Sequence, residues 1–151
     1  MAFLLGAFGH AVKTQRDRLS KIAFDIAHQE SLHTIQSENG ILFAGYKKEE
    51  NLEFINDHIF VLPHNQGVLM GRIFDRTNYK SVVADKIFAK TIIDNPRNLS
   101  SLYWGRYVGV LFNMFEHTMH LVRDPHGLFQ LFYVIDKDLI LFSTEVSLLY
   151  K

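Results

Sequence analysis

The stretch Val122–Val134, "VRDPHGLFQLFYV", interrupts a strongly apolar run with charge, proline and glycine and then resumes it at once. Pro125 has a fixed φ and donates no ladder hydrogen bond, and Gly127 tolerates a positive φ. Pro-His-Gly between two runs of Phe, Leu, Val and Tyr therefore predicts a tight connection between strands. On this local chemistry alone, Arg123 and Asp124 are polar residues at a strand end.

Four strand-like runs surround this connection, namely "RYVGVLFNMF", "TMHLVRD", "LFQLFYVI" and "LILFST". The turns between them are Glu116-His117, Pro125-His126-Gly127 and Asp136-Lys137-Asp138. Connections this short leave no room for a parallel crossover. The sequence therefore predicts one antiparallel meander of four strands over residues 106–144.

The first part of the chain alternates between the two kinds of pattern. "MAFLLGAFG" predicts a buried first strand, and Glu38-Asn39-Gly40 predicts a hairpin within "LHTIQSENGILFAGY". "HIFVLP" and "GVLMGRIF" predict two further strands. Between the first strand and the hairpin, the spacing of five apolar residues is typical of an amphipathic helix: Leu19, Ile22, Ala23, Ile26 and Ala27.

A second helix is predicted in "SVVADKIFAKTIIDNP", where an apolar face recurs at helical spacing through Val83, Ala84, Ile87 and Thr91. Pro96 should end it, because the residue before a proline avoids the α region. "NLSSLYWG" indicates one more helical turn, which we expect Asn98 to cap and Gly105 to end.

Composition limits the class of protein. The chain has 151 residues, of which 48% are hydrophobic and 13 are Phe, so it can bury a sizeable core. We expect an α+β fold with two stacked antiparallel sheets flanked by helices, in a single domain over residues 1–151. No linker-like or repetitive tract divides the sequence.

Charge and cysteine content exclude several functions. Lys+Arg and Asp+Glu each number 16, which argues against a nucleic-acid surface. The absence of Cys excludes disulfides, Cys-based metal sites and thiol catalysis. The apolar opening is too short to span a membrane, so we expect no membrane partner and a cytoplasmic location.

Other chemistry-bearing residues form no convincing constellation. His117 and His120 lie three apart across a hairpin, where strand alternation sends them to opposite faces, so they do not predict a shared metal. Asp136 and Asp138 are typical of a solvated turn, and His126 of a surface turn. No spacing nominates a Ser-His-Asp triad.

Taken in order, several motifs resemble the glutaminase-type domain of asparagine synthetase and related enzymes. The match is strongest from about Leu102 onward, and "VLMGRIFDR" and "MAFLLGAFG" stand where that family has two further motifs. The residues that carry the resemblance are Gly105-Arg106-Tyr107, Arg123-Asp124 with Gly127, Leu131-Phe132-Tyr133, and Phe142-Ser143-Thr144-Glu145 with Leu148 or Leu149. The resemblance implies an N-terminal nucleophile fold, an αββα sandwich in reduced form.

The catalytic positions implied by this resemblance are degenerate. Active members need a thiol or hydroxyl on the first mature residue, whereas this chain offers Ala2, or Met1 if it is kept. Met70 replaces the Asn that stabilises the oxyanion, beside a retained Gly71, and a thioether donates no hydrogen bond. The Arg that clamps glutamine is missing from Ile55 to Pro63, and the Ser-Asp-x-Glu piece is missing after it.

The resemblance therefore implies a catalytically silent glutaminase-like domain, as in β-lactam synthetase or lasso-peptide cyclases. It implies neither a cofactor nor a metal, and no enzyme activity of the chain by itself. The Ser-Gly-Gly-x-Asp-Ser pyrophosphate loop of the synthetase domain is absent from the sequence. We expect the domain to pack against such a synthetase domain, in cis or in trans, or against a copy of itself.

Two alternatives remain open from the sequence. The empty glutamine pocket, with Phe-rich walls and Met70, is a candidate site for an apolar small molecule or peptide. An enzyme with an unrelated site is the other alternative. For Arg123 and Asp124 we expect a structural role, through an internal ion pair or a hydrogen bond to the following turn.

The last residues, "STEVSLLYK", predict a helix capped by Ser143 or Thr144, with Glu145 favoured near its start. An apolar face is expected at Val146, Leu149 and Tyr150. In the family the corresponding helix leads on toward the synthetase domain. We therefore expect this helix to be an attachment point, covered by a partner or partly exposed.

Overall fold

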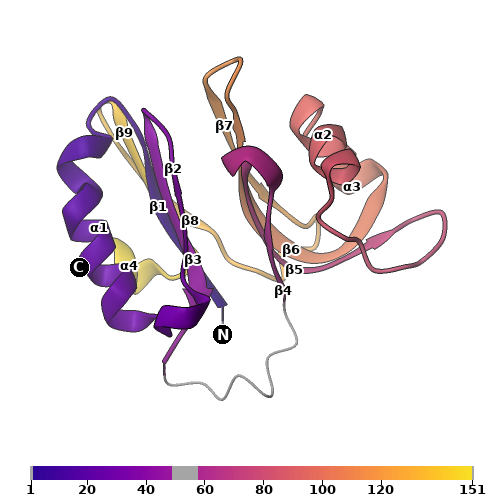
Figure 1. Cartoon of the computed structure of the whole chain (residues 1–151), viewed down its shortest axis with the longest axis horizontal. Helices are drawn as coiled ribbons and strands as arrows, with labels where there is room; N and C mark the ends of the chain where they lie inside the picture. Colours follow the sequence, from indigo (N-terminus) through magenta and orange to yellow (C-terminus); the bar gives the residue numbers. More distant parts are fainter. Residues whose placement is uncertain (1, 49–57, 151) are drawn as a thin grey trace. The chain divides into compact units, whose positions relative to one another are not determined.

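The computed structural model describes residues 2–48 and 58–150, which form an α+β fold with two antiparallel sheets and a few helices (Figure 1). Contacts divide the chain into two compact units, which we call the first unit (residues 1–55 and 131–151) and the second unit (residues 56–130). Each unit is built on one sheet. The predicted α+β class and the antiparallel pairing are confirmed.

The sheet of the first unit has the strand order β2-β3-β1-β9-β8. The central strand β1 pairs antiparallel with β3 on one side and β9 on the other. This arrangement confirms the buried first strand and the hairpin at Glu38-Asn39-Gly40. The strands are β1 (Ala2–Gly9), β2 (His33–Gln36), β3 (Gly40–Tyr46), β8 (Phe132–Asp136) and β9 (Leu139–Ser143).

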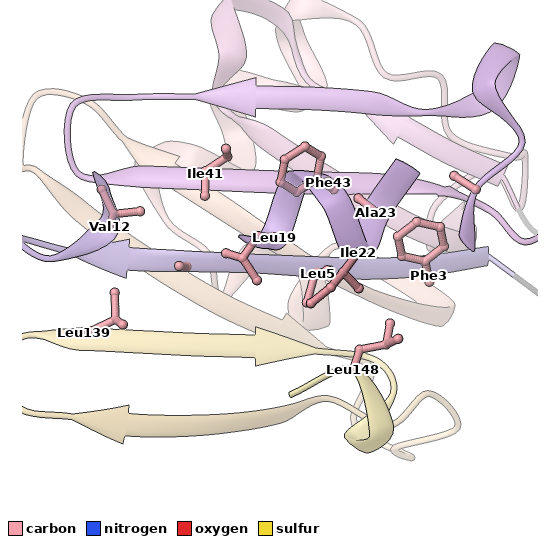
Figure 2. Packing of buried hydrophobic residues seen from close by; sticks show 12 residues of the cluster. Phe3, Leu5, Val12, Leu19, Ile22, Ala23, Ile41, Phe43, Leu139 and Leu148 are labelled. Atoms are coloured by element: carbon pink, nitrogen blue, oxygen red, sulfur yellow. The ribbon is translucent and has the colours of Figure 1, made fainter. Parts of the chain in front are cut away.

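Helix α1 (Val12–Ile26) covers one face of this sheet. Leu19, Ile22 and Ala23 form its buried side as expected, and they pack with Phe3 and Phe43 of the sheet (Figure 2). Burial of each large apolar side chain contributes about 1.5–3 kcal/mol. A short 3-10 turn (Gln29–Ser31) leads from α1 towards β2.

The sheet of the second unit has the strand order β4-β5-β6-β7. Its core lies between the sheet and the helices, where Leu69, Ile73 and Tyr107 of the strands pack with Ile92 and Leu99 of the helices. The elements are β4 (His58–Val61), a 3-10 turn (Pro63–Asn65), β5 (Gly67–Asp75), α2 (Lys86–Asp94), α3 (Asn98–Ser101), β6 (Tyr103–Asn113) and β7 (Thr118–Arg123).

The predicted face of the second helix is wrong. The side chain of Asp85 accepts a hydrogen bond from the Phe88 amide at 2.8 Å, and this cap starts α2 at Lys86. The start at this position turns Phe88 and its neighbours inward, while Ile87 is 78% exposed and Val83 precedes the helix. The predicted stop before Pro96 is confirmed, because α2 ends at Asp94.

The predicted ends of the next helical turn are also wrong. Asn98 is the first residue of α3 and not its cap, since its amide Nδ2 donates to the Thr91 carbonyl at 2.9 Å. Gly105 does not end a helix but lies inside β6, which already begins at Tyr103. Residues from Tyr103 onward pair with β5 instead of continuing the helix, and Trp104 stacks on Phe74 across the two strands.

The last helix is shorter than expected and differently anchored. Helix α4 (Val146–Leu149) has no side-chain cap, because Thr144 accepts a hydrogen bond from the Leu4 amide instead. Ser143 donates to the Leu4 carbonyl and accepts from the Glu145 amide. Leu148 is the residue that packs into the core (Figure 2), whereas Val146 and Tyr150 are exposed.

The four C-terminal strands do not form one meander. Strand β7 pairs with β6 in the second unit, and β8 pairs with β9 in the first unit. The run that begins at Leu128 enters a strand only at Phe132, so the connection spans residues 124–131. A connection of this length carries the chain from one sheet to the other. The predicted meander assumed a tight turn at Pro125-His126-Gly127 and is wrong at this point.

Gly71 marks a close approach of two backbones within the second sheet. Its φ is +132°, and a Cβ at this position would lie 2.0 Å from the Arg106 carbonyl oxygen on the paired strand. Only glycine adopts this conformation without strain. Gly71 is therefore required by β5–β6 pairing, whatever its role in a site.

We expect Gly71→Ala to lower the free energy of unfolding by at least about 2 kcal/mol, because it adds both backbone strain and a steric clash. Urea unfolding followed by circular dichroism measures the change. Gly45→Ala is the matched control, since Gly45 lies in β3 without a positive φ and its Cβ would meet no atom closer than 3.3 Å. Equal losses in the two variants would contradict this account.

Candidate functional site

The residues nominated by the resemblance are divided between the two units. Ala2 and Glu145 belong to the first unit. The second unit brings three of the others together at the end of β7. The second-unit residues are Met70, Gly71, Arg123, Asp124 and Gly127.

Ala2 is the first residue of the central strand β1, where it pairs with Tyr46. Its side chain is 2% exposed and carries only a methyl group. Met1, the alternative position for a nucleophile, lies outside the described residues. The start of β1 therefore offers no thiol or hydroxyl for attack on an amide.

Met70 lies in β5 opposite Val108 and is fully buried. Its thioether has no hydrogen to donate to an oxyanion. The resemblance places the Arg that clamps glutamine between Ile55 and Pro63. Residues 58–63 contain no Arg, and Ile55, Asn56 and Asp57 lie outside the described residues. No carboxylate clamp for glutamine is present at this place among residues 58–63.

Glu145 follows strand β9 and forms an ion pair with Lys47, with the Nζ and Oε1 atoms 2.7 Å apart. Both side chains are only partly exposed, which makes this pair better shielded than a surface pair. Together with the contacts of Ser143 and Thr144 to Leu4, the pair ties the chain after β9 to β1 and the end of β3. Glu145 therefore has a structural partner at this position.

Asp124 organises the turn after β7. It is 1% exposed, and its backbone amide donates to the Tyr107 carbonyl at 2.8 Å, which extends the β6–β7 ladder by one residue. Its Oδ1 accepts from the His126 amide at 2.9 Å and from the Leu128 amide at 3.5 Å, and its carbonyl accepts from the Gly127 amide. Its Oδ2 is buried and accepts no hydrogen bond from the described residues.

The side chain of Arg123 is directed towards Gly127 and not towards the carboxylate of Asp124. The described residues contain no ion pair between Arg123 and Asp124, so of the two contacts expected for them only the hydrogen bond to the turn is present. Its guanidinium lies over Gly127, where a Cβ would be 3.4 Å from Nη1, and Gly127 has a φ of +65°. Phe129 of the same connection lies beneath the guanidinium of Arg106, 5.0 Å from its ring centre to Cζ. This cation–π contact holds the connection against β6.

Tyr107 belongs to the Gly105-Arg106-Tyr107 motif, but the sequence assigned no chemical role to its phenol, because a Tyr inside an apolar strand is typical of a core. Its ring is buried between β6 and the helices. Burial, and to a smaller extent the charge of Asp124, raises the pKa of the Tyr107 phenol to about 12, against a lowering by Arg76. The phenol therefore stays protonated at physiological pH.

The described residues contain no cluster of three His, Asp or Glu that would hold a metal ion. His120 lies within β7, whereas His117 lies in the turn before that strand, at a φ of +52°. Nor does any helix within the described ranges have the length and apolar character needed to cross a membrane.

Comparison with protein-family models and with curated proteins gave no match for this chain. The resemblance to glutaminase-type domains thus rests on the residues quoted from the sequence and stays a prediction.

Asp124→Ala should lower the free energy of unfolding by about 1–3 kcal/mol, because the His126 amide loses its acceptor. Asp124→Asn keeps an oxygen in the same place and should lose clearly less. Urea unfolding of the three proteins at neutral pH measures both effects. If the Asn variant were as unstable as the Ala variant, the charge of Asp124 would matter and not its acceptor role.

The raised pKa of Tyr107 predicts a loss of stability at high pH. Above about pH 10 the unfolded chain releases the phenol proton while the folded chain keeps it, so the stabilisation is complete below that pH and disappears as the pH approaches 12. Urea midpoints at about pH 9 and about pH 11 should therefore fall more steeply for the wild type than for Tyr107→Phe. Tyr103, whose pKa is also raised by burial, is present in both proteins and cancels. Parallel slopes would contradict the assignment.

Proposed function

We propose that this chain is a catalytically silent domain of the glutaminase type, an N-terminal nucleophile fold that serves assembly beside an ATP-dependent, amide-forming synthetase domain. The observation that carries the proposal is Ala2 at the start of the buried central strand β1, the position at which this class of enzyme needs its nucleophile. Met70, buried in β5 without a donor, supports the same conclusion.

An assembly role is supported by an edge strand that a partner can extend. Strand β8 forms one edge of the first sheet, and Tyr133, Val134 and Ile135 are 60%, 42% and 64% exposed. Val134 lies on one face of the sheet and its two neighbours on the other, so both faces of the edge are apolar. Natural proteins normally protect such an edge with charge, proline or a covering element.

The partner proposed for β8 is the synthetase domain, in cis or in trans, with a second copy of the chain as the alternative. Asp136 is the one charged residue of β8 and lies at its end, which leaves the middle of the strand free to pair. Two exposed residues of the neighbouring C-terminal segment, Val146 and Tyr150, add apolar area in the same unit.

The absence of glutaminase chemistry is tested by incubating the purified chain with glutamine and measuring ammonia. We expect no turnover by the wild type and none by Ala2→Cys, because a thiol alone supplies neither an oxyanion donor at Met70 nor a clamp for the substrate. Turnover by the wild type would overturn the proposal. A thermal shift with glutamine or an apolar peptide, in the absence of turnover, would favour the binding-module alternative instead.

The assembly role is tested by mixing the chain with a synthetase that contains the Ser-Gly-Gly-x-Asp-Ser loop and is encoded beside it. We expect a complex in size-exclusion chromatography, weakened at least tenfold by Ile135→Lys, since a charge is introduced on the pairing edge. Ile87→Lys is the matched control, because Ile87 is at least as exposed as Ile135, at 78% against 64%, but lies on helix α2. Self-association without a complex would support the homo-oligomer, and a monomer that binds no synthetase would overturn the assembly role.

A further inference from the structure

Strand β7 leaves one row of backbone groups without a partner. It is the last strand of the second sheet and pairs only with β6 among the described residues. The Asp124 amide donates to the Tyr107 carbonyl, so the backbone of Asp124 faces β6. Because backbone groups alternate in direction along a strand, the N–H and C=O groups of Met119, Leu121 and Arg123 point away from β6.

These outward groups of β7 form no hydrogen bond with the described part of the chain. Met119 and Leu121 are half-buried and Arg123 is exposed, so the edge is accessible. Donors and acceptors that recur every second residue match the backbone of another extended chain. The edge of β7 therefore suits a strand and not a compact ligand.

A hollow of about 390 Å³ lies beside this edge, between β7 and helix α3. Leu99 and Ser100 line it from the helix, and Val122 and Tyr107 line it from the sheet. Three of these residues belong to the core under the helices, so the hollow lies on the helix-covered face of the sheet. A strand added beside β7 would direct every second side chain to this face. The hollow therefore suits large apolar side chains of such a strand.

The helical wall of the hollow is held in place by hydrogen bonds. Arg76 donates to the Ser100 and Tyr103 carbonyls, at 3.1 and 3.0 Å, and Asn98 donates to the Thr91 carbonyl. A groove with a fixed wall binds a peptide at a smaller entropic cost than a groove that must be ordered.

The charge of β7 favours an acidic residue at one end of the added strand. The strand contains no acidic residue, and Arg123 at its end is exposed and forms no ion pair with a described residue. Asp124 is buried, and the register places it on the opposite face of the sheet from Arg123. Opposite charges at directly opposed positions of two strands are favourable. A Glu or Asp beside Arg123 therefore complements this edge.

We propose that the free edge of β7 and the α3–β7 hollow together bind an extended peptide with alternating large apolar side chains and an acidic residue beside Arg123. The peptide adds as an antiparallel strand, and its backbone bonds to Met119, Leu121 and Arg123 while its apolar side chains enter the hollow. This edge belongs to the second unit and includes neither β8 nor Ala2, so the inference is independent of the proposed function.

Titration of the intact chain with the peptide Ac-Glu-Leu-Thr-Leu-Thr-Ser-NH2, followed by amide NMR, tests this proposal. We expect saturable shifts and slower hydrogen exchange at the amides of Met119, Leu121 and Arg123, because these groups gain acceptors. With Glu opposite Arg123, the first Thr amide faces β7 and the second Leu amide faces away. N-methylation of that Thr should abolish binding, whereas N-methylation of that Leu should not. Equal effects of the two isomers, or the absence of any saturable shift, would overturn the proposal.

Variants locate the binding. Ser100→Phe should weaken it more than about tenfold by filling the hollow. Ser101→Phe is the matched control, because Ser101 is also exposed on α3 but does not line the hollow. Ile135→Lys should leave binding unchanged, and a loss in this variant would place the peptide on β8 and overturn the site. A dimer that protects the same β7 amides without peptide would show that a second copy is the occupant, which would also overturn the proposal.

Discussion

The hydrogen bonds of Asp124 form the constraint on which the architecture depends. Its amide closes the ladder against Tyr107, and its carboxylate then accepts from the amides of the following turn. The chain leaves one sheet at this residue and enters the other at Phe132. Because a buried carboxylate is unfavourable without hydrogen bonds, the turn and the charge stabilise each other. Each sheet can then complete its own pairing.

The chemistry of the chain follows from what these strands present. The start of β1 and the middle of β5 carry Ala2 and Met70, side chains that neither attack nor donate. The buried polar side chains of the described residues, Asp124 and Ser143, take part instead in hydrogen bonds within the chain. Their hydrogen bonds hold strand ends and turns in place.

The two sheets treat their edges differently. Strand β7 lies beside a hollow that α3 also lines, whereas β8 exposes a run of apolar residues. An uncovered apolar edge favours pairing with another strand. The β8 edge is therefore the surface on which the proposed assembly role rests.

The sequence by itself determined the nature and the sheet class of most elements. Apolar periodicity located the strands and α1, because apolar residues recur about every two residues along a strand and about every 3.6 residues along a helix. Tertiary structure decided the rest. The face of α2 depended on the cap at Asp85, Gly105 was taken up by pairing with β5, and β7 and β8 joined different sheets. Tyr107 and Asp124 became neighbours only when folding paired β6 with β7. The physical reason is that pairing partners and cavity walls are set by long-range contacts, which local periodicity does not encode.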